Sequence, residues 1–217
     1  MPLLLTIFAT IILNYSYSQS QNTNISDFGL GDPKLEIENV AKKSLDTYLN
    51  LIPVGNEGQY GFVNRREFSM AKLGSVYRLL TLSDKYFTDK VIDTGRSYIV
   101  NTNEFLVPIT VNGHYRALLT VARMGGVWKT VGLSSAELAK ELELFERSHK
   151  RDSPDRFILR IFQLESDFVY TNNESPKEDL VYPLNSAKLG LGKLISDKLV
   201  YSLPDILEAV RNKKNIR

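Results

Sequence analysis

The stretch EFLVPITVNGHYRALLTVARMGGVWKTV, residues 104–131, decides the fold of this chain. Apolar side chains alternate with others before and after Asn112-Gly113, the pair best suited to a two-residue hairpin turn because both of its places need positive φ. A second tight turn is predicted at Gly125-Gly126, ahead of a further short strand. We therefore expect a three-stranded antiparallel meander over about residues 104–131.

Amphipathic helices are predicted on both sides of this meander in the sequence. Residues 34–52 and residues 134–148 place apolar side chains at helical spacings of three and four. The middle strand of the meander is apolar on both of its faces, because Leu118 and Leu119 are neighbours, so we expect cover on both sides. These features predict an α+β fold, in which an antiparallel sheet packs against amphipathic helices.

The first residues of the chain are predicted to be a signal peptide, residues 1–18. Leu3 to Leu13 form an uncharged apolar run, which is shorter than the roughly 20 residues that a membrane-spanning helix needs. Ser16 and Ser18 fit the small-residue positions of a cleavage site. The run lacks the usual preceding Lys or Arg, which is the one departure from the signal-peptide pattern.

The remaining chain is expected to be exported to the periplasm, the cell surface or the extracellular space. Residues 19–33 are mostly polar and predict a flexible leader. Residues 34–217 are expected to form a single α+β domain, with a subdivision near the charged residues 150–155 as the alternative. No second long apolar run is present, so we expect no membrane span after signal cleavage.

The composition argues against several classes of function. The chain has no cysteine, which excludes disulfides, thiol nucleophiles and cysteine metal sites. Its 27 basic and 25 acidic residues give a net charge of +2, too small to predict binding to nucleic acid. Its two histidines, His114 and His149, do not stand at a metal-binding spacing. We therefore predict no cofactor, no metal site and no catalytic residues.

Aromatic side chains give the one indication of a recognition surface. The chain holds 11 tyrosines, and tyrosine is favoured at interfaces because it joins an apolar ring to a polar hydroxyl. Arg123 is expected opposite Trp128, with its guanidinium over the indole ring, an interaction worth roughly 0.5–1 kcal/mol when exposed. The predicted surface comprises Tyr60, Phe62, Tyr77, Tyr86, Arg123 and Trp128.

The function that we expect is non-enzymatic binding or an envelope-associated role, with another exported or envelope protein as the partner. The absence of a complete catalytic constellation in the sequence favours this interpretation. Two alternatives stay open. One is a secreted hydrolase that acts on glycans through carboxylates such as Glu104, Glu165 and Asp167. The other is a protease inhibitor that inserts an exposed hairpin, such as Val111–Tyr115.

Several segments resemble exported bacterial proteins of unknown function. The resemblance rests on Lys72-Leu73-Gly74 and on the stretches ALLTV (117–121), GVWKTV (126–131) and LAKEL (138–142). It covers about residues 65–170, and all of these residues lie in predicted strands, turns and helices. The resemblance implies an exported bacterial protein, and it supplies no catalytic residues.

Overall fold

The computed structural model describes residues 33–89, 95–134, 136–149, 155–173, 175, 178–195 and 198–215. The predicted signal peptide and all of the predicted leader except Pro33 lie outside these residues. The helices are α2 (Lys34–Asn50), α3 (Asp84–Thr88), α4 (Ala136–Ser148), α5 (Asn185–Leu191) and α6 (Leu203–Asn215). Short 3-10 helices are η2 (Glu57–Tyr60), η3 (Arg65–Met70), η4 (Arg96–Tyr98), η5 (Phe162–Leu164) and η7 (Gly192–Ile195). The strands are β1 (Lys72–Leu73), β2 (Tyr77–Leu82), β3 (Ile99–Val111), β4 (His114–Met124), β5 (Val127–Ser134), β6 (Arg156–Ile161), β7 (Ser166–Thr171), β8 (Leu180–Pro183) and β9 (Tyr201–Ser202).

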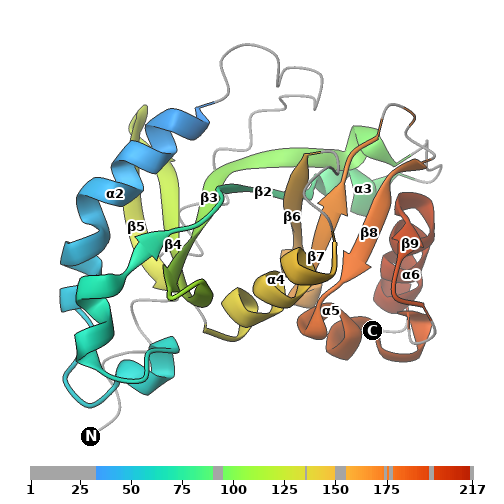
Figure 1. Ribbon diagram of the computed structural model, residues 1–217. Helices are drawn as coiled ribbons and strands as arrows, with labels where there is room; N and C mark the ends of the chain where they lie inside the picture. Colours follow the sequence, from blue (N-terminus) through green and yellow to red (C-terminus); the bar gives the residue numbers. More distant parts are fainter. Residues whose placement is uncertain are drawn as a thin grey trace, which may run out of the picture.

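All of these strands belong to one curved, nine-stranded sheet (Figure 1). Its order is β5-β4-β3-β2-β6-β7-β8-β9, and β1 pairs with β3 beyond the end of β2. Among the strands of the described residues, only β2 and β6 pair in parallel, with Leu79 beside Ile158. The sheet therefore consists of two antiparallel halves joined by one parallel pair. β2 comes before residues 150–155 in the chain and β6 comes after them, so this pair makes one continuous sheet from the two segments.

The α+β class is confirmed, whereas the sheet is much larger than the three strands that the sequence predicted. Strands β3, β4 and β5 pair in order and occupy one end of the sheet. Their two turns lie at Asn112-Gly113 and Gly125-Gly126, where all four residues have positive φ. Local turn chemistry thus sets these three strands, while long-range pairing adds the rest of the sheet.

Helices cover both faces of the sheet. On one face α2 buries Ile37 and Ala41 against β3 and β4, in a cluster that includes Leu119. On the opposite face α4 lies across the strands and packs in a cluster that includes Leu118 and Leu142. The expected cover on both sides of the middle strand is therefore observed.

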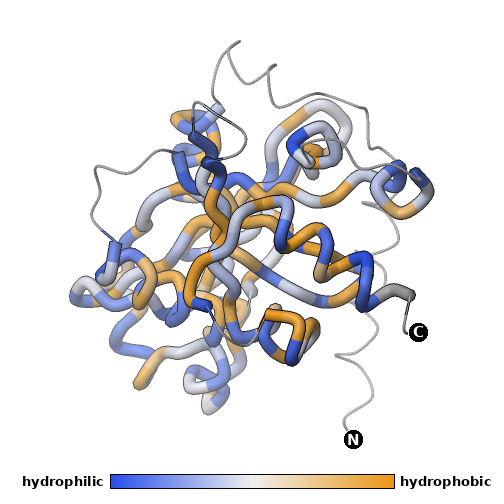
Figure 2. Tube along the Cα trace, turned by 90° about the vertical axis from the view of Figure 1, so that its right-hand side faces the viewer, coloured by the Kyte–Doolittle hydropathy of each residue, from blue (hydrophilic) through white to orange (hydrophobic). Residues whose placement is uncertain are grey.

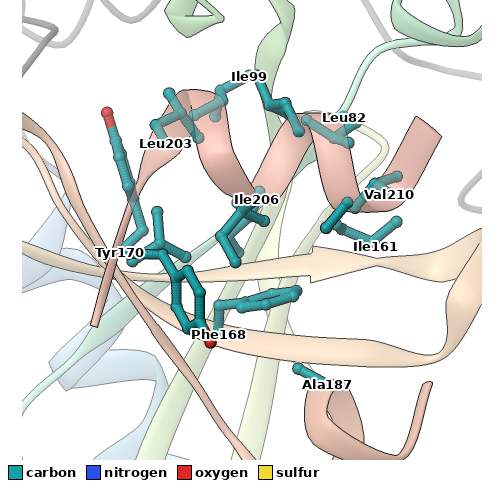
Figure 3. Packing of buried hydrophobic residues seen from close by; sticks show 14 of the residues in the cluster. Leu82, Ile99, Ile161, Phe168, Tyr170, Ala187, Leu203, Ile206 and Val210 are labelled. Atoms are coloured by element: carbon teal, nitrogen blue, oxygen red, sulfur yellow. The ribbon is translucent and has the colours of Figure 1, made fainter. Parts of the chain in front are cut away.

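A third cluster fills the second half of the sheet, on the same face as α2. There α6 places Leu203, Ile206 and Val210 over the sheet residues Phe168 and Tyr170 (Figure 3). All five side chains are fully buried. Burial of a large apolar side chain stabilises a fold by about 1.5–3 kcal/mol, so this cluster fixes α6 firmly on the sheet.

A buried ion pair connects the two halves of the chain near α6. The side chain of Asp179 is fully buried, and it accepts a hydrogen bond from Arg96 Nε at 2.9 Å. It also accepts hydrogen bonds from Tyr170 Oη at 2.7 Å and from the backbone N–H of Asn173 at 2.9 Å. A buried charge is tolerated only when it is paired and hydrogen-bonded, so these contacts hold η4 in place against β7 and β8.

Candidate functional site

The six residues of the predicted recognition surface do not lie together. Phe62, Tyr77 and Tyr86 are buried in three different clusters, which pack against α2, α4 and α6 respectively. Tyr60 is half-buried beside the α2 cluster. For the three buried residues the prediction of a surface role is wrong, because aromatic character alone does not distinguish an exposed ring from a core ring.

The two buried tyrosines use their hydroxyl groups for internal hydrogen bonds. Tyr77 Oη donates to Glu146 Oε1 at 2.6 Å. Tyr86 Oη donates to the carbonyl oxygen of Leu207 on α6. Burial raises the pKa of both phenols, that of Tyr86 to about 12, and the nearby guanidinium of Arg211 opposes the rise at Tyr86. Both residues therefore serve the packing of α4 and α6 rather than contact with a partner.

The other two predicted residues meet on the hairpin that joins β4 and β5. Arg123 lies directly opposite Trp128, as predicted, with its guanidinium carbon 5.8 Å from the centre of the indole ring. The Arg123 Nε also donates to the carbonyl oxygen of Gly126 at 3.3 Å. The indole ring in turn makes an edge contact with Phe105, at 5.2 Å between ring centres. The exposed arginine is thereby connected through Trp128 to the core of the sheet.

The next pair along this hairpin consists of two exposed apolar residues. Met124 and Val127 lie opposite each other, with 46% and 57% of their surfaces exposed. The turn between them, Gly125-Gly126, stands clear of the protein, because a Cβ built on either glycine would meet no other atom within 4 Å. We name Arg123, Met124, Val127 and Trp128 the hairpin tip.

Helix α2 fixes the strand that carries the second half of the hairpin tip. Tyr48 Oη donates to the carbonyl oxygen of Thr130 at 2.5 Å. Ser44 Oγ lies 2.5 Å from Thr130 Oγ1, also in hydrogen-bond contact. The hairpin tip is therefore held in position before any partner binds, which reduces the entropy lost on association.

The sequence pointed to only half of the hairpin tip. Arg123 and Trp128 were identified by their pairing across the predicted turn, whereas Met124 and Val127 were missed. The available signal was their position next to Gly125-Gly126, since residues at the tip of a hairpin have no neighbouring strand beyond them to cover their side chains.

Arginine side chains pair with six carboxylates of the described residues. Among the described residues, ion pairs join Arg65 to Glu57, Arg96 to Asp179, Arg116 to Glu67, Arg147 to Glu143, Arg156 to Glu146 and Arg160 to Asp167. Each of these carboxylates is therefore engaged in an internal contact of the protein.

The three carboxylates singled out in the sequence do not form a catalytic pair either. Glu104 lies on β3 and Asp167 on β7, three strand positions away, or about 14 Å across the sheet. Glycoside hydrolases place their two carboxyl groups roughly 5–10 Å apart. Glu165 stands at the turn before β7, but its neighbour Asp167 already accepts two hydrogen bonds from Arg160, at 2.6 and 3.2 Å.

The hairpin suggested as an inhibitor element is attached to the protein body. Val111 is fully buried, and the backbone N–H of Tyr115 donates to Glu143 Oε2 on α4 at 2.7 Å. His114 Nδ1 lies 3.0 Å from the other oxygen of Glu143. Within the described part of the chain, no group of three or more His, Cys, Asp or Glu residues is placed to hold a metal ion.

The raised pKa of Tyr86 predicts a loss of stability in alkaline solution. An unfolded chain releases a tyrosine proton near pH 10, whereas folded Tyr86 keeps its proton up to about pH 12. Between these values the unfolded state binds fewer protons, so the free energy of unfolding falls as pH rises, by roughly 1 kcal/mol at about pH 11 from this group. Urea titrations at about pH 8 and about pH 11 should show a smaller loss in Tyr86→Phe than in the parent protein.

The partly exposed Tyr60 provides the control for this measurement. Tyr60→Phe should lose as much stability between the two pH values as the parent protein. An equal loss in Tyr86→Phe would contradict the assignment of the alkaline sensitivity to Tyr86.

No protein-family model, no curated protein and no solved structure matches this chain. The resemblance to exported bacterial proteins stays a prediction. The functional proposal below therefore depends on the chemistry of the hairpin tip.

Proposed function

We propose that this protein is an exported, non-enzymatic binding protein that contacts another exported or envelope protein through the hairpin tip. The observation that supports this proposal is the pairing of two exposed apolar residues, Met124 and Val127, beside the stacked Arg123 and Trp128. Arginine, tryptophan and methionine are enriched at protein interfaces, and a few such side chains commonly supply most of the affinity.

The energetics favour contact at this place. Full burial of an exposed valine or methionine side chain yields about 1.5–3 kcal/mol, and Met124 and Val127, which are about half exposed, would each gain roughly half of that. Because Arg123 Nε already donates to Gly126, the guanidinium offers a partner its four remaining N–H donors in a fixed plane, suited to a carboxylate. Because α2 and the core already hold this hairpin, little conformational freedom remains to be lost on binding.

A non-enzymatic role agrees with how the charged residues are used. The arginine–carboxylate pairs listed above include contacts between distant parts of the chain, such as Arg116 with Glu67 and Arg156 with Glu146. They serve as internal connections between these segments.

Export is part of this proposal and depends on the opening residues of the sequence. The apolar run Leu3 to Leu13, followed by Ser16 and Ser18, is typical of a secretory signal. A chain without cysteine gains nothing from an oxidising compartment, so its stability must come from packing. The three buried clusters supply that packing.

A site-specific crosslink tests the proposed contact. A photo-crosslinking residue at Val127 should give one adduct of defined mass with an envelope extract, whereas the same residue at the exposed Leu144 on α4 should not. Met124→Asn should reduce the Val127 adduct about tenfold, because the partner would then cover a polar amide. Leu144→Asn is the matched control and should leave the adduct unchanged. Equal crosslinking from both positions would count against the hairpin tip.

The export step has its own test. When the full chain is expressed in a bacterium, we expect the protein in the exported fraction with Gln19 as its first residue. Ile11→Lys should keep the chain in the cytosol, because a charge interrupts the apolar run that the export machinery reads. Recovery of the uncleaved parent chain from the cytosol would contradict this part of the proposal and leave the hairpin tip untouched.

A further inference from the structure

The end of the sheet opposite the hairpin tip carries a repeated pair of residues. Lysine followed by leucine occurs at five-residue intervals, in Lys188-Leu189, Lys193-Leu194 and Lys198-Leu199. These pairs lie on α5, on η7 and in the connection to β9. Figure 2 views the molecule from the side on which α6 lies in Figure 1. We name these six residues the Lys-Leu edge.

The leucines of the Lys-Leu edge face away from the core. Leu189 and Leu199 are each 85% exposed, and Leu194 is exposed as well. The buried residues of the same segment are Ala187, Leu191 and Ile195, which pack in the α6 cluster. Because Ala187, Leu191 and Ile195 occupy the positions that face the core, the lysine-leucine pairs lie on the outside of the segment.

The backbone beneath the Lys-Leu edge is held close to the sheet. Gly190 lies so near Ser166 on β7 that a Cβ at this position would collide with the serine hydroxyl. Further along, the backbone N–H of Lys198 donates to Tyr201 Oη at 3.0 Å, and the lysine ammonium lies 5.8 Å from the centre of the Tyr201 ring. The exposed leucines are therefore presented on an anchored segment, where their exposure is a property of the fold.

We propose that the Lys-Leu edge binds the surface of a bilayer that contains anionic phospholipids. Exposed leucines can enter the boundary between headgroups and acyl chains, while lysine stems lie along it and their ammonium groups reach the phosphates. The charge of this segment is complementary to such a surface: residues 185–200 hold three lysines and one aspartate, in a chain whose net charge is only +2.

Contact of this kind is peripheral. Among the described residues no helix is both long enough and apolar enough to cross a membrane. A few leucines with three lysines give reversible attachment, which depends on anionic lipid and on ionic strength. This inference goes beyond the proposed binding function, because it concerns a different surface and does not need the hairpin tip.

The two surfaces are compatible with each other. β7, on which α5 packs, is five strand positions from β5, so the hairpin tip and the Lys-Leu edge are separated by about 24 Å along the curved sheet. A protein attached to a bilayer through the Lys-Leu edge would keep Met124 and Val127 accessible to a partner.

Vesicle co-sedimentation tests the proposal. The protein is purified from the expressing bacterium and used without further processing of its N-terminus. The probes are mixed phosphatidylglycerol–phosphatidylcholine vesicles and pure phosphatidylcholine vesicles. The parent protein should sediment with the anionic vesicles at low salt, much less at high salt, and not with the neutral ones. The variants share the same N-terminal residues, so that part of the chain cannot cause a difference between them.

Two variants remove the two components of the interaction. The triple change Lys188→Gln, Lys193→Gln and Lys198→Gln should weaken binding to anionic vesicles roughly a hundredfold, or about fivefold for each lysine. The double change Leu189→Asn and Leu199→Asn should weaken it about tenfold or more. Both sets of side chains are exposed, so these variants should still fold, and urea unfolding checks this; the triple variant also loses the contact of the Lys198 ammonium with the Tyr201 ring.

Matched controls carry the same changes elsewhere on the surface. The triple change Lys42→Gln, Lys43→Gln and Lys140→Gln removes equal charge, and Leu51→Asn with Leu144→Asn replaces two leucines that are 68% and 67% exposed; both should leave binding unchanged. An equal loss in the controls, or no sedimentation of the parent protein with anionic vesicles at low salt, would overturn the proposal. A third outcome would also overturn it: the parent protein self-associates and does not bind vesicles, and Leu189→Asn with Leu199→Asn abolishes the self-association. In that case a second copy of the chain, not a bilayer, would cover the Lys-Leu edge.

Discussion

The parallel pairing of β2 with β6 is the constraint on which the rest of the structure depends. After β5 the chain stands at the edge of the sheet, four strand positions, or about 19 Å, from the place where β6 must enter. Helix α4 has 13 residues and is about 20 Å long, and it lies across the strands on the way back (Figure 1). Its buried residues pack on strands from both halves. The helix that returns the chain therefore also covers the central pair of β2 and β6.

This arrangement gives the protein two separated surfaces on one rigid body. The first half of the sheet ends in the hairpin tip, held by α2 through Tyr48 and Ser44. The second half ends at the Lys-Leu edge, held by the α6 cluster and by the buried pair of Arg96 and Asp179. Because one sheet connects both ends, a protein partner and a bilayer would be kept at a fixed separation.

Local patterns in the sequence predicted much of the first half of the fold. Asn112-Gly113 and Gly125-Gly126 fix their turns because few other residue pairs adopt positive φ twice in succession. The adjacent Leu118 and Leu119 correctly indicated cover on both faces. The pairing of β2 with β6 had no such signal, because parallel strands far apart in sequence are joined by no turn and are chosen by the whole core.

The recognition residues show a similar limit. Arg123 and Trp128 followed from strand register, which the turn determines, whereas the burial of Tyr77 and Tyr86 follows from helices that pack on them from far along the chain. Residue type alone does not predict this burial, because tyrosine occurs both at interfaces and in cores where its hydroxyl group has a hydrogen-bond partner. Exposure of Met124 and of the lysine-leucine pairs likewise depends on which side of each element the core occupies.

Native-state hydrogen exchange tests most directly whether the sheet is one unit centred on β2, β6 and α4. Leu142 on α4 is fully buried at this centre, so Leu142→Ala should cost about 3 kcal/mol. We expect amides in β4 and amides in β7 to exchange through the same global opening, and both sets to lose the same protection in Leu142→Ala. Loss of protection in β4 alone, with β7 unchanged, would show that the two halves open independently and would contradict this account.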